Sequence, residues 1–293
     1  LFNDTIRLPL APDKFQLTAS DPVAADTAML SLASHGFARE VVVKYLGIGY
    51  TAGTANDGSV IWGRIAGFTS RIKRIRSFAR SRVVIGQRIA KTSGIPSMAH
   101  GNEVTGVNTS QLNSMRQAVY RASTVSKNSV CTTTALLVAP TERLDPSFVV
   151  HESPIVKWAN AVYTNRYQIG ELHLLIRDAV RKMTKVGIGS HWRHVGNPIH
   201  ALVLTAARIG WRFVNASMIV DHNKRRIDLT EIPGPRLARR IQEAVEIWLW
   251  RQVVERKLDR DLKRGGSEWV DGWKVANPWD ALRQGVYLRP LKA

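Results

Sequence analysis

The feature that most constrains this chain is a long basic stretch without a single acidic residue, between Gly58 and Asn102. Its basic residues are Arg64, Arg71, Lys73, Arg74, Arg76, Arg80, Arg82, Arg88 and Lys91. A helix surface that only faces water mixes charges of both signs, because opposite charges three or four residues apart stabilise the helix. Charge of one sign over this length favours a polyanionic partner. A formal net charge of +19 over the 293-residue chain points the same way.

Apolar residues inside this stretch recur three and four positions apart. They are Ile65, Phe68, Ile72, Ile75, Ala79 and Val83, and their spacing predicts one long amphipathic helix from about Trp62 to Thr92. Gly94-Ile95-Pro96 is expected to break that helix. The basic residues fall mostly outside the apolar stripe. Solvation is the ordinary role of such a charged face, but the missing acidic partners favour a binding role here.

The first part of the chain has the pattern of a strand, a helix and a second strand. Lys14 to Ala19 is a strand candidate, and a helix follows with Asp21 as its cap, Pro22 at its first position and Gly36 at its end. The second strand is predicted from Glu40 to Tyr50. A helix between two strands needs a sheet to cover, and so short a segment cannot supply one. Because the chain also begins with a leucine and not a methionine, we expect a fragment whose remaining sheet lies upstream or elsewhere in the chain.

The remainder is mostly helical by pattern. Helices are predicted at Gln111–Ser123, Pro154–Lys185 (one or two helices), Ile199–Ile209 and Pro235–Gly265, with a hairpin inside Phe213–Leu229 that turns at Asp221–Lys224. The last helix mixes acidic residues among its arginines. Its charged side is therefore interpreted first as a solvated surface and only second as a binding surface. Thr141–Ser147 is the best domain boundary. The sequence therefore predicts an α+β fold that is mostly α-helical.

Composition excludes several classes of protein. No apolar run is long enough to span a bilayer and no signal peptide opens the chain, so no membrane partner is expected. The single cysteine, Cys131, excludes an internal disulfide and a cysteine-based zinc site, which fits an intracellular location, nuclear or cytoplasmic. His191 and His194 lack a third metal ligand at a suitable spacing. The Gly-x-Ser-x-Gly motif of hydrolases does not occur.

Three glycines after the valine-rich run, Gly47, Gly49 and Gly53, mimic a dinucleotide-binding pattern. That motif needs a helix to open directly at the glycines, so that the helix N-terminus meets the pyrophosphate. Residues 54–59 have the composition of a loop instead. An enzyme with a nucleotide cofactor is therefore the third and least favoured hypothesis, and we expect this chain to hold no cofactor of its own.

Three segments resemble LINE-type (non-LTR) retroelement reverse transcriptases, over roughly the first 125 residues. Lys44-Tyr45-Leu46-Gly47-Ile48 is similar to the strand that holds the primer end, where a glycine permits close backbone approach. Leu8 to Lys14 is similar to the segment after the catalytic aspartates, and the resemblance makes Lys14 the candidate proton donor to the leaving pyrophosphate. Gly94 to Val104, ahead of the helical residues Leu112 to Arg116, resembles the region after the first thumb helix.

By this resemblance, residues 1–56 are the end of a palm, residues 57–140 a basic helical thumb, and residues 141–293 a helical C-terminal region without an assigned role. The primer-grip residues would be Lys44, Tyr45, Leu46 and Gly47. The thumb would hold the phosphates of an RNA template and DNA primer through the nine basic residues between Gly58 and Asn102. The short strand–helix–strand unit would then be a remnant of the palm.

The resemblance implies that the parent protein is an RNA-directed DNA polymerase that uses Mg²⁺. Phosphoryl transfer to a nucleotide chain needs carboxylates that hold two metal ions about 4 Å apart, and no Asp-Asp dipeptide occurs here. We therefore expect the metal site in a palm and fingers upstream in the same polyprotein, and no polymerisation by this chain alone. The alternative is a non-enzymatic, basic, helical nucleic-acid-binding protein, such as a decayed element fragment.

Overall fold

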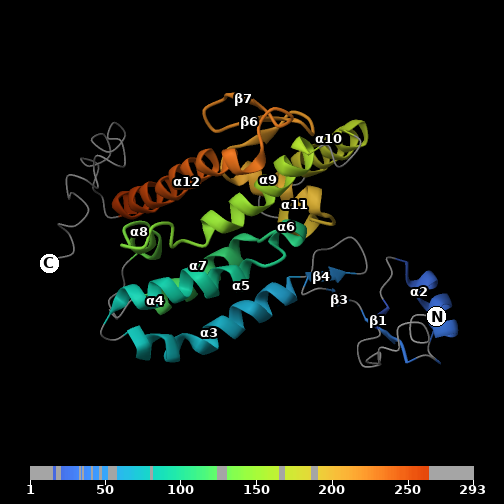
Figure 1. Cartoon of the computed structure of the whole chain (residues 1–293), viewed down its shortest axis with the longest axis horizontal. Coiled ribbons are helices and arrows are strands. Elements are labelled where there is room, and N and C mark those ends of the chain that lie inside the picture. Colours follow the sequence, from blue (N-terminus) through green and yellow to red (C-terminus); the bar gives the residue numbers. More distant parts are fainter. Residues whose placement is uncertain are drawn as a thin grey trace.

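The structure is a computed structural model, which describes residues 16–17, 21–32, 34, 36–40, 42–45, 48–51, 58–79, 82–123, 131–164, 169–185 and 191–263 (Figure 1). Its helices are α2 (Pro22–Leu32), α3 (Ser59–Ala79), α4 (Val83–Ile89), α5 (Ile95–Ala99), α6 (Asn102–Thr105), α7 (Thr109–Ser123), α8 (Thr132–Leu137), α9 (Ser147–Tyr163), α10 (Ile169–Lys185), α11 (Pro198–Arg208) and α12 (Gly234–Lys263). The strands are β1 (Gln16–Leu17), β2 (Ala38–Arg39), β3 (Val42–Tyr45), β4 (Ile48–Thr51), β5 (Arg212–Phe213), β6 (Met218–Val220) and β7 (Arg226–Asp228). The mostly helical α+β class is confirmed.

The N-terminal elements form a strand–helix–strand unit whose two strands have two residues each. β1 and β2 pair in parallel, with Gln16 opposite Ala38, and α2 connects them. Asp21 caps α2 as predicted, because its Oδ1 accepts a hydrogen bond of 3.0 Å from the Val23 N–H. Residues 14, 15, 18 and 19 of the first predicted strand lie outside the described residues.

The predicted single strand from Glu40 to Tyr50 is wrong, because the chain reverses inside it. β3 and β4 pair antiparallel, with Val42 opposite Thr51 and Tyr45 opposite Ile48. Two residues connect them, which is the commonest hairpin length and one that favours glycine. β-propensity alone does not predict this turn, because the valine-rich run before it favours a continuous strand. Figure 1 shows this hairpin beside the N-terminal end of α3, a helix that β4 contacts.

The predicted long helix from about Trp62 to Thr92 is also wrong, since α3 ends at Ala79 and α4 begins at Val83. The reason is close packing of α4. A Cβ on Gly86 would lie 2.6 Å from the carbonyl oxygen of Ala122 on α7 and 3.0 Å from the Ala79 Cβ. The chain must therefore turn after α3 to place α4 against both helices, which a continuous helix cannot do.

The predicted helix break at Gly94-Ile95-Pro96 does not occur. A π-helical turn, η3 (Ala90–Gly94), leads directly into α5, and Pro96 lies in the first turn of that helix. The Ile95 N–H donates to the Ala90 carbonyl in the π-helical pattern, so the helical path continues up to Pro96, which has no N–H of its own to donate. A Cβ on Gly94 would lie 2.4 Å from the Phe68 ring, so this glycine permits α3 to approach.

Two hydrophobic clusters form the core. The first packs the buried side of α3 against α5 and α7, and the second packs α9, α10, α11, α12 and the β5–β7 sheet. α9 joins them, because Phe148 belongs to the second cluster and Val150 to the first. The Trp248 side chain on α12 packs against both. The division into residues 1–56, 57–140 and 141–293 stays a prediction.

The C-terminal half follows the sequence pattern closely. The predicted helices appear as α9 with α10, as α11 and as α12, and the predicted hairpin is β6 with β7, extended by β5 into an antiparallel sheet. The predicted helix start at Pro154 is wrong, because α9 begins at Ser147 and contains Pro154. Asp221 fixes the predicted turn, because its Oδ1 accepts from the N–H groups of Asn223 (2.8 Å) and Arg225 (2.9 Å). None of the helices in the described part is both long and apolar enough to cross a membrane.

Candidate nucleic-acid interface

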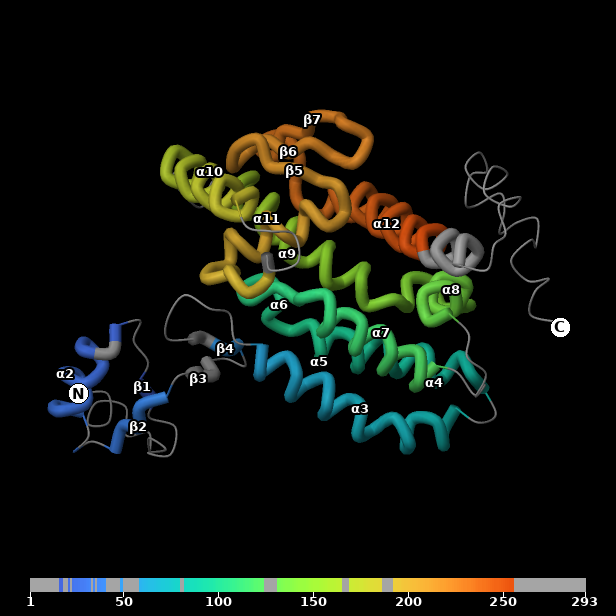
Figure 2. Tube along the Cα trace, turned by 180° about the vertical axis from the view of Figure 1, so that it is seen from behind, coloured from blue at the N-terminus to red at the C-terminus, as the bar shows by residue number. Residues whose placement is uncertain are grey.

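The buried side of α3 fixes which of its residues face outward. Ile61, Ile65, Phe68, Ile72, Ile75 and Ala79 are all buried. This confirms the predicted stripe with one exception, Val83, which lies on α4 and is exposed. Figures 1 and 2 show α3 at the edge of the molecule, packed on one side only. Its other side is therefore presented outward along its whole length.

Three cationic side chains occupy that outward surface. Arg71, Lys73 and Arg74 are exposed, and none of them pairs with an acidic group among the residues that the structure describes. The same surface carries two glycines without side chains, Gly63 and Gly67, and it is open, because a Cβ added to either glycine would meet nothing within 4 Å. Glycines on a helix surface leave room for a phosphate backbone to approach closely, and nearby cationic side chains can then contact the phosphates. We call Arg71, Lys73 and Arg74 the α3 basic face.

The basic surface continues onto α4. Arg82 precedes that helix and Arg88 lies in its last turn, and both are exposed. The Arg82 N–H donates to the Ala79 carbonyl at 3.1 Å, so the two helices meet at a tight corner. Arg80, the remaining predicted binding residue in this region, lies outside the described residues.

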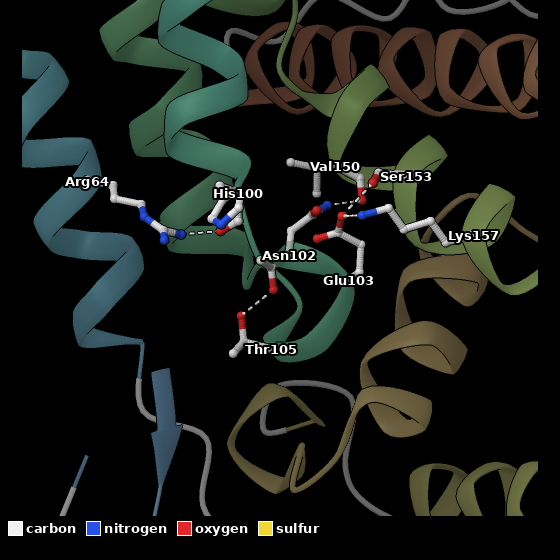
Figure 3. A network of polar contacts seen from close by, with 9 residues as sticks. Arg64, His100, Asn102, Glu103, Thr105, Val150, Ser153 and Lys157 are labelled. Atoms are coloured by element: carbon white, nitrogen blue, oxygen red, sulfur yellow. Dashed lines mark hydrogen bonds and ion pairs between the residues drawn. The ribbon is translucent and has the colours of Figure 1, made fainter. Parts of the chain in front are cut away.

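Two of the predicted binding residues bond to other parts of the protein, and a third is only partly exposed. The Arg64 guanidinium donates to the His100 carbonyl (Figure 3), and burial lowers the pKa of that guanidinium. The Lys91 ammonium group donates to the Glu142 carbonyl at 2.6 Å. Arg76 is half-buried. The side chains of Arg64 and Lys91 thus hold α3 and η3 against neighbouring segments and are not part of the α3 basic face.

A polar network near the Arg64 contact ties α6 to α9 (Figure 3). The Asn102 side chain donates to the Val150 carbonyl at 3.0 Å, which ties the start of α6 to α9. Glu103 accepts hydrogen bonds from Lys157 and, at 3.1 Å, from Ser153. Burial alone would raise the pKa of Glu103, but the hydrogen bonds and the charge of Lys157 outweigh it and leave that pKa below its ordinary value.

The predicted primer-grip segment lies next to this network. Lys44 pairs with Gly49, and Tyr45 with Ile48, across the β3–β4 hairpin. Ile48 meets the turn before α6, where a Cβ on Gly101 would lie 2.9 Å from its Cγ1 atom. Gly101 has a φ of 81°, which favours glycine. Leu46, Gly47 and the predicted proton donor Lys14 lie outside the described residues. β4 contacts both α3 and α6, so the structure places the hairpin beside both helices.

Other predictions concern metals and buried charge. Among the described residues, no three His, Cys, Asp or Glu side chains gather where they could hold a metal ion.

Sequence reasoning missed a buried ion pair, in which Arg116 Nε donates to Asp145 Oδ2 at 2.8 Å. A signal was present, because Arg116 falls on the same helical stripe as Leu112, Met115 and Val119. That stripe is buried throughout.

Comparison of the chain with protein-family models, with curated proteins and with solved structures found no match.

Proposed function

We propose that this chain binds nucleic acid through the α3 basic face and the adjoining corner with α4. The observation that carries the proposal is that Arg71, Lys73 and Arg74 are exposed together on a helix without acidic residues. Cations that are not neutralised within the protein gain most from contacts with phosphates, because those contacts release condensed counterions. Such contacts set position along a nucleic acid and carry no sequence information.

The finer proposal is that α3 acts as the thumb of a LINE-type RNA-directed DNA polymerase. What supports it is the order and contact of the elements: a β-hairpin carrying Lys44 and Tyr45 comes directly before the basic helix and lies beside its first turns. In this role the hairpin would hold the primer end while α3 contacts the template–primer phosphates. The proposal gives the chain a binding role, and it routes no chemical step through Mg²⁺, whose ligands we expect upstream.

A binding experiment with two charge-matched variants tests the general proposal. The first variant is R71Q/K73Q/R74Q, and its control is R177Q/K182Q/K185Q, which removes three exposed charges from α10 on the far side of the molecule (Figure 2). Fluorescence anisotropy of a labelled DNA duplex should show that the α3 variant binds about a hundredfold more weakly at low salt. The α10 control should bind within a few fold of the unmodified chain. Equal affinity for both variants would refute the proposal.

The polymerase role needs a separate test, because a non-enzymatic binding protein would pass the first one. The coding sequence upstream of Leu1 should contain, in frame, a Tyr- or Phe-x-Asp-Asp motif and a further aspartate on an earlier strand. An unrelated domain at that place would leave the binding role and remove the polymerase.

A further inference from the structure

An exposed apolar corner adjoins the α3 basic face. The Phe78 side chain, in the last turn of α3, is 66% exposed. Val83, Val84 and Ile85, in the first turn of α4, are 39%, 40% and 38% exposed. A Cβ on Gly86 would lie 3.0 Å from the Ala79 Cβ, so α4 lies close against the last turn of α3, the turn that carries Phe78. Large apolar side chains that gather on a surface mark an interaction site more often than single ones do.

Arginines surround this corner. Arg71 and Arg74 precede Phe78 by seven and four residues, so the three side chains share one side of α3. Arg82 and Arg88 lie at the two ends of α4, and both are exposed. An apolar platform in such a setting complements a ligand that offers flat apolar faces and phosphates together, which is the chemistry of an unpaired nucleotide.

We propose that the Phe78 corner binds unpaired nucleotides of a single strand, by stacking a base on Phe78 while the flanking arginines contact its phosphates. A duplex keeps its bases stacked on one another, so it can use the arginines but not Phe78. The α3 basic face and the Phe78 corner would together receive a junction, with paired nucleic acid along α3 and unpaired nucleotides at the end of that helix. This inference rests on the proposed nucleic-acid binding and adds the class of ligand.

The test compares a single-stranded oligonucleotide with a duplex of equal length. Phe78→Ala should weaken binding of the single strand by about 5-fold to 100-fold, because stacking of one base on an aromatic side chain is lost. Binding of the duplex should change less than about twofold. Phe78→Tyr should retain the affinity for the single strand, since it keeps an aromatic ring. 2-Aminopurine placed in the oligonucleotide should show a fluorescence change on binding that Phe78→Ala removes.

Leu174→Ala is the matched control, because Leu174 is 54% exposed and belongs to α10, a helix that lies far from α4 (Figure 2). It should change neither affinity. Circular dichroism should show that every variant folds, as expected for replacements of exposed side chains.

The outcomes separate this inference from the function on which it rests. If R71Q/K73Q/R74Q weakens binding of both ligands and Phe78→Ala weakens neither, the corner does not bind bases, and the inference fails alone. If the charge variant also has no effect, the proposed function fails. Binding to anionic lipid vesicles that depends on Phe78, without dependence on Phe78 for the single strand, would assign the corner to a membrane surface and overturn the inference.

Discussion

Replacement of Arg116 by methionine should strongly destabilise the fold. The side chains of Arg116 and Asp145 are 3% and 0% exposed, and Arg116 Nε lies 2.8 Å from Asp145 Oδ2. Without the guanidinium, the buried carboxylate keeps one hydrogen bond, 2.9 Å long, from the Ser147 N–H. A charge left buried without its partner costs about 3–5 kcal/mol. We expect that loss in the free energy of unfolding of Arg116→Met, measured by urea denaturation with circular dichroism.

Replacement of the other member of the ion pair, Asp145→Leu, should reduce the free energy of unfolding by a similar amount, because it leaves the guanidinium of Arg116 buried without its partner. The double variant R116M/D145L replaces the pair by apolar groups, so it should be more stable than the sum of the single losses by about 3 kcal/mol. Arg121→Met, at an exposed position of the same helix, should change the free energy of unfolding by less than about 0.5 kcal/mol. Equal losses for Arg116→Met and Arg121→Met would refute the buried ion pair.

Two further predictions concern stability. Burial, with the charge of Arg208, lowers the pKa of His151 to about 3, while the unfolded chain takes up the proton near its ordinary value. The unfolded state therefore binds more protons between those values, and acidification from pH 7 to pH 5 should reduce the free energy of unfolding by about 2 kcal/mol. Comparison of urea midpoints at both pH values should show that His151→Phe lacks this part of the loss; an unchanged pH dependence would contradict the buried neutral imidazole. Gly94→Ala should cost about 1–3 kcal/mol, because its Cβ would lie 2.4 Å from the Phe68 ring. Gly67→Ala, in open space on α3, should instead stabilise by about 0.8 kcal/mol through helix propensity, and thermal unfolding of both variants should show opposite shifts.

The sequence predicted the elements whose signals are local. The buried stripe of α3, the helices of the second half and the Asp221 turn all follow from spacing, capping or turn chemistry within a few residues. The break after Ala79 could not be predicted this way. Its cause is the fit of Gly86 against Ala122, a residue on another helix, while the apolar spacing continues without a change through the break.

The sequence predicted which region of the chain carries the candidate interface, but not which basic residues of that region belong to it. The absence of acidic residues identified the region correctly as one with exposed cations. Which cations bond to other parts of the protein depends on distant partners, since Arg64 donates to a carbonyl 36 residues away and Lys91 to one 51 residues away. Phe78 did carry a signal, because it falls outside the apolar stripe of α3. An aromatic residue at such a position predicts exposure, and the arginines near it give that exposure a chemical context.

The measurement that tests the central claim most directly is the salt dependence of duplex binding. Each phosphate contacted contributes about 0.9 to the slope of log binding constant against log salt concentration, so loss of three contacts should reduce that slope by about 2.7. We predict this reduction for R71Q/K73Q/R74Q, and an unchanged slope for R177Q/K182Q/K185Q. Equal reductions in both variants would mean that net charge and not the α3 basic face drives binding, and an unchanged slope in the α3 variant would contradict the account.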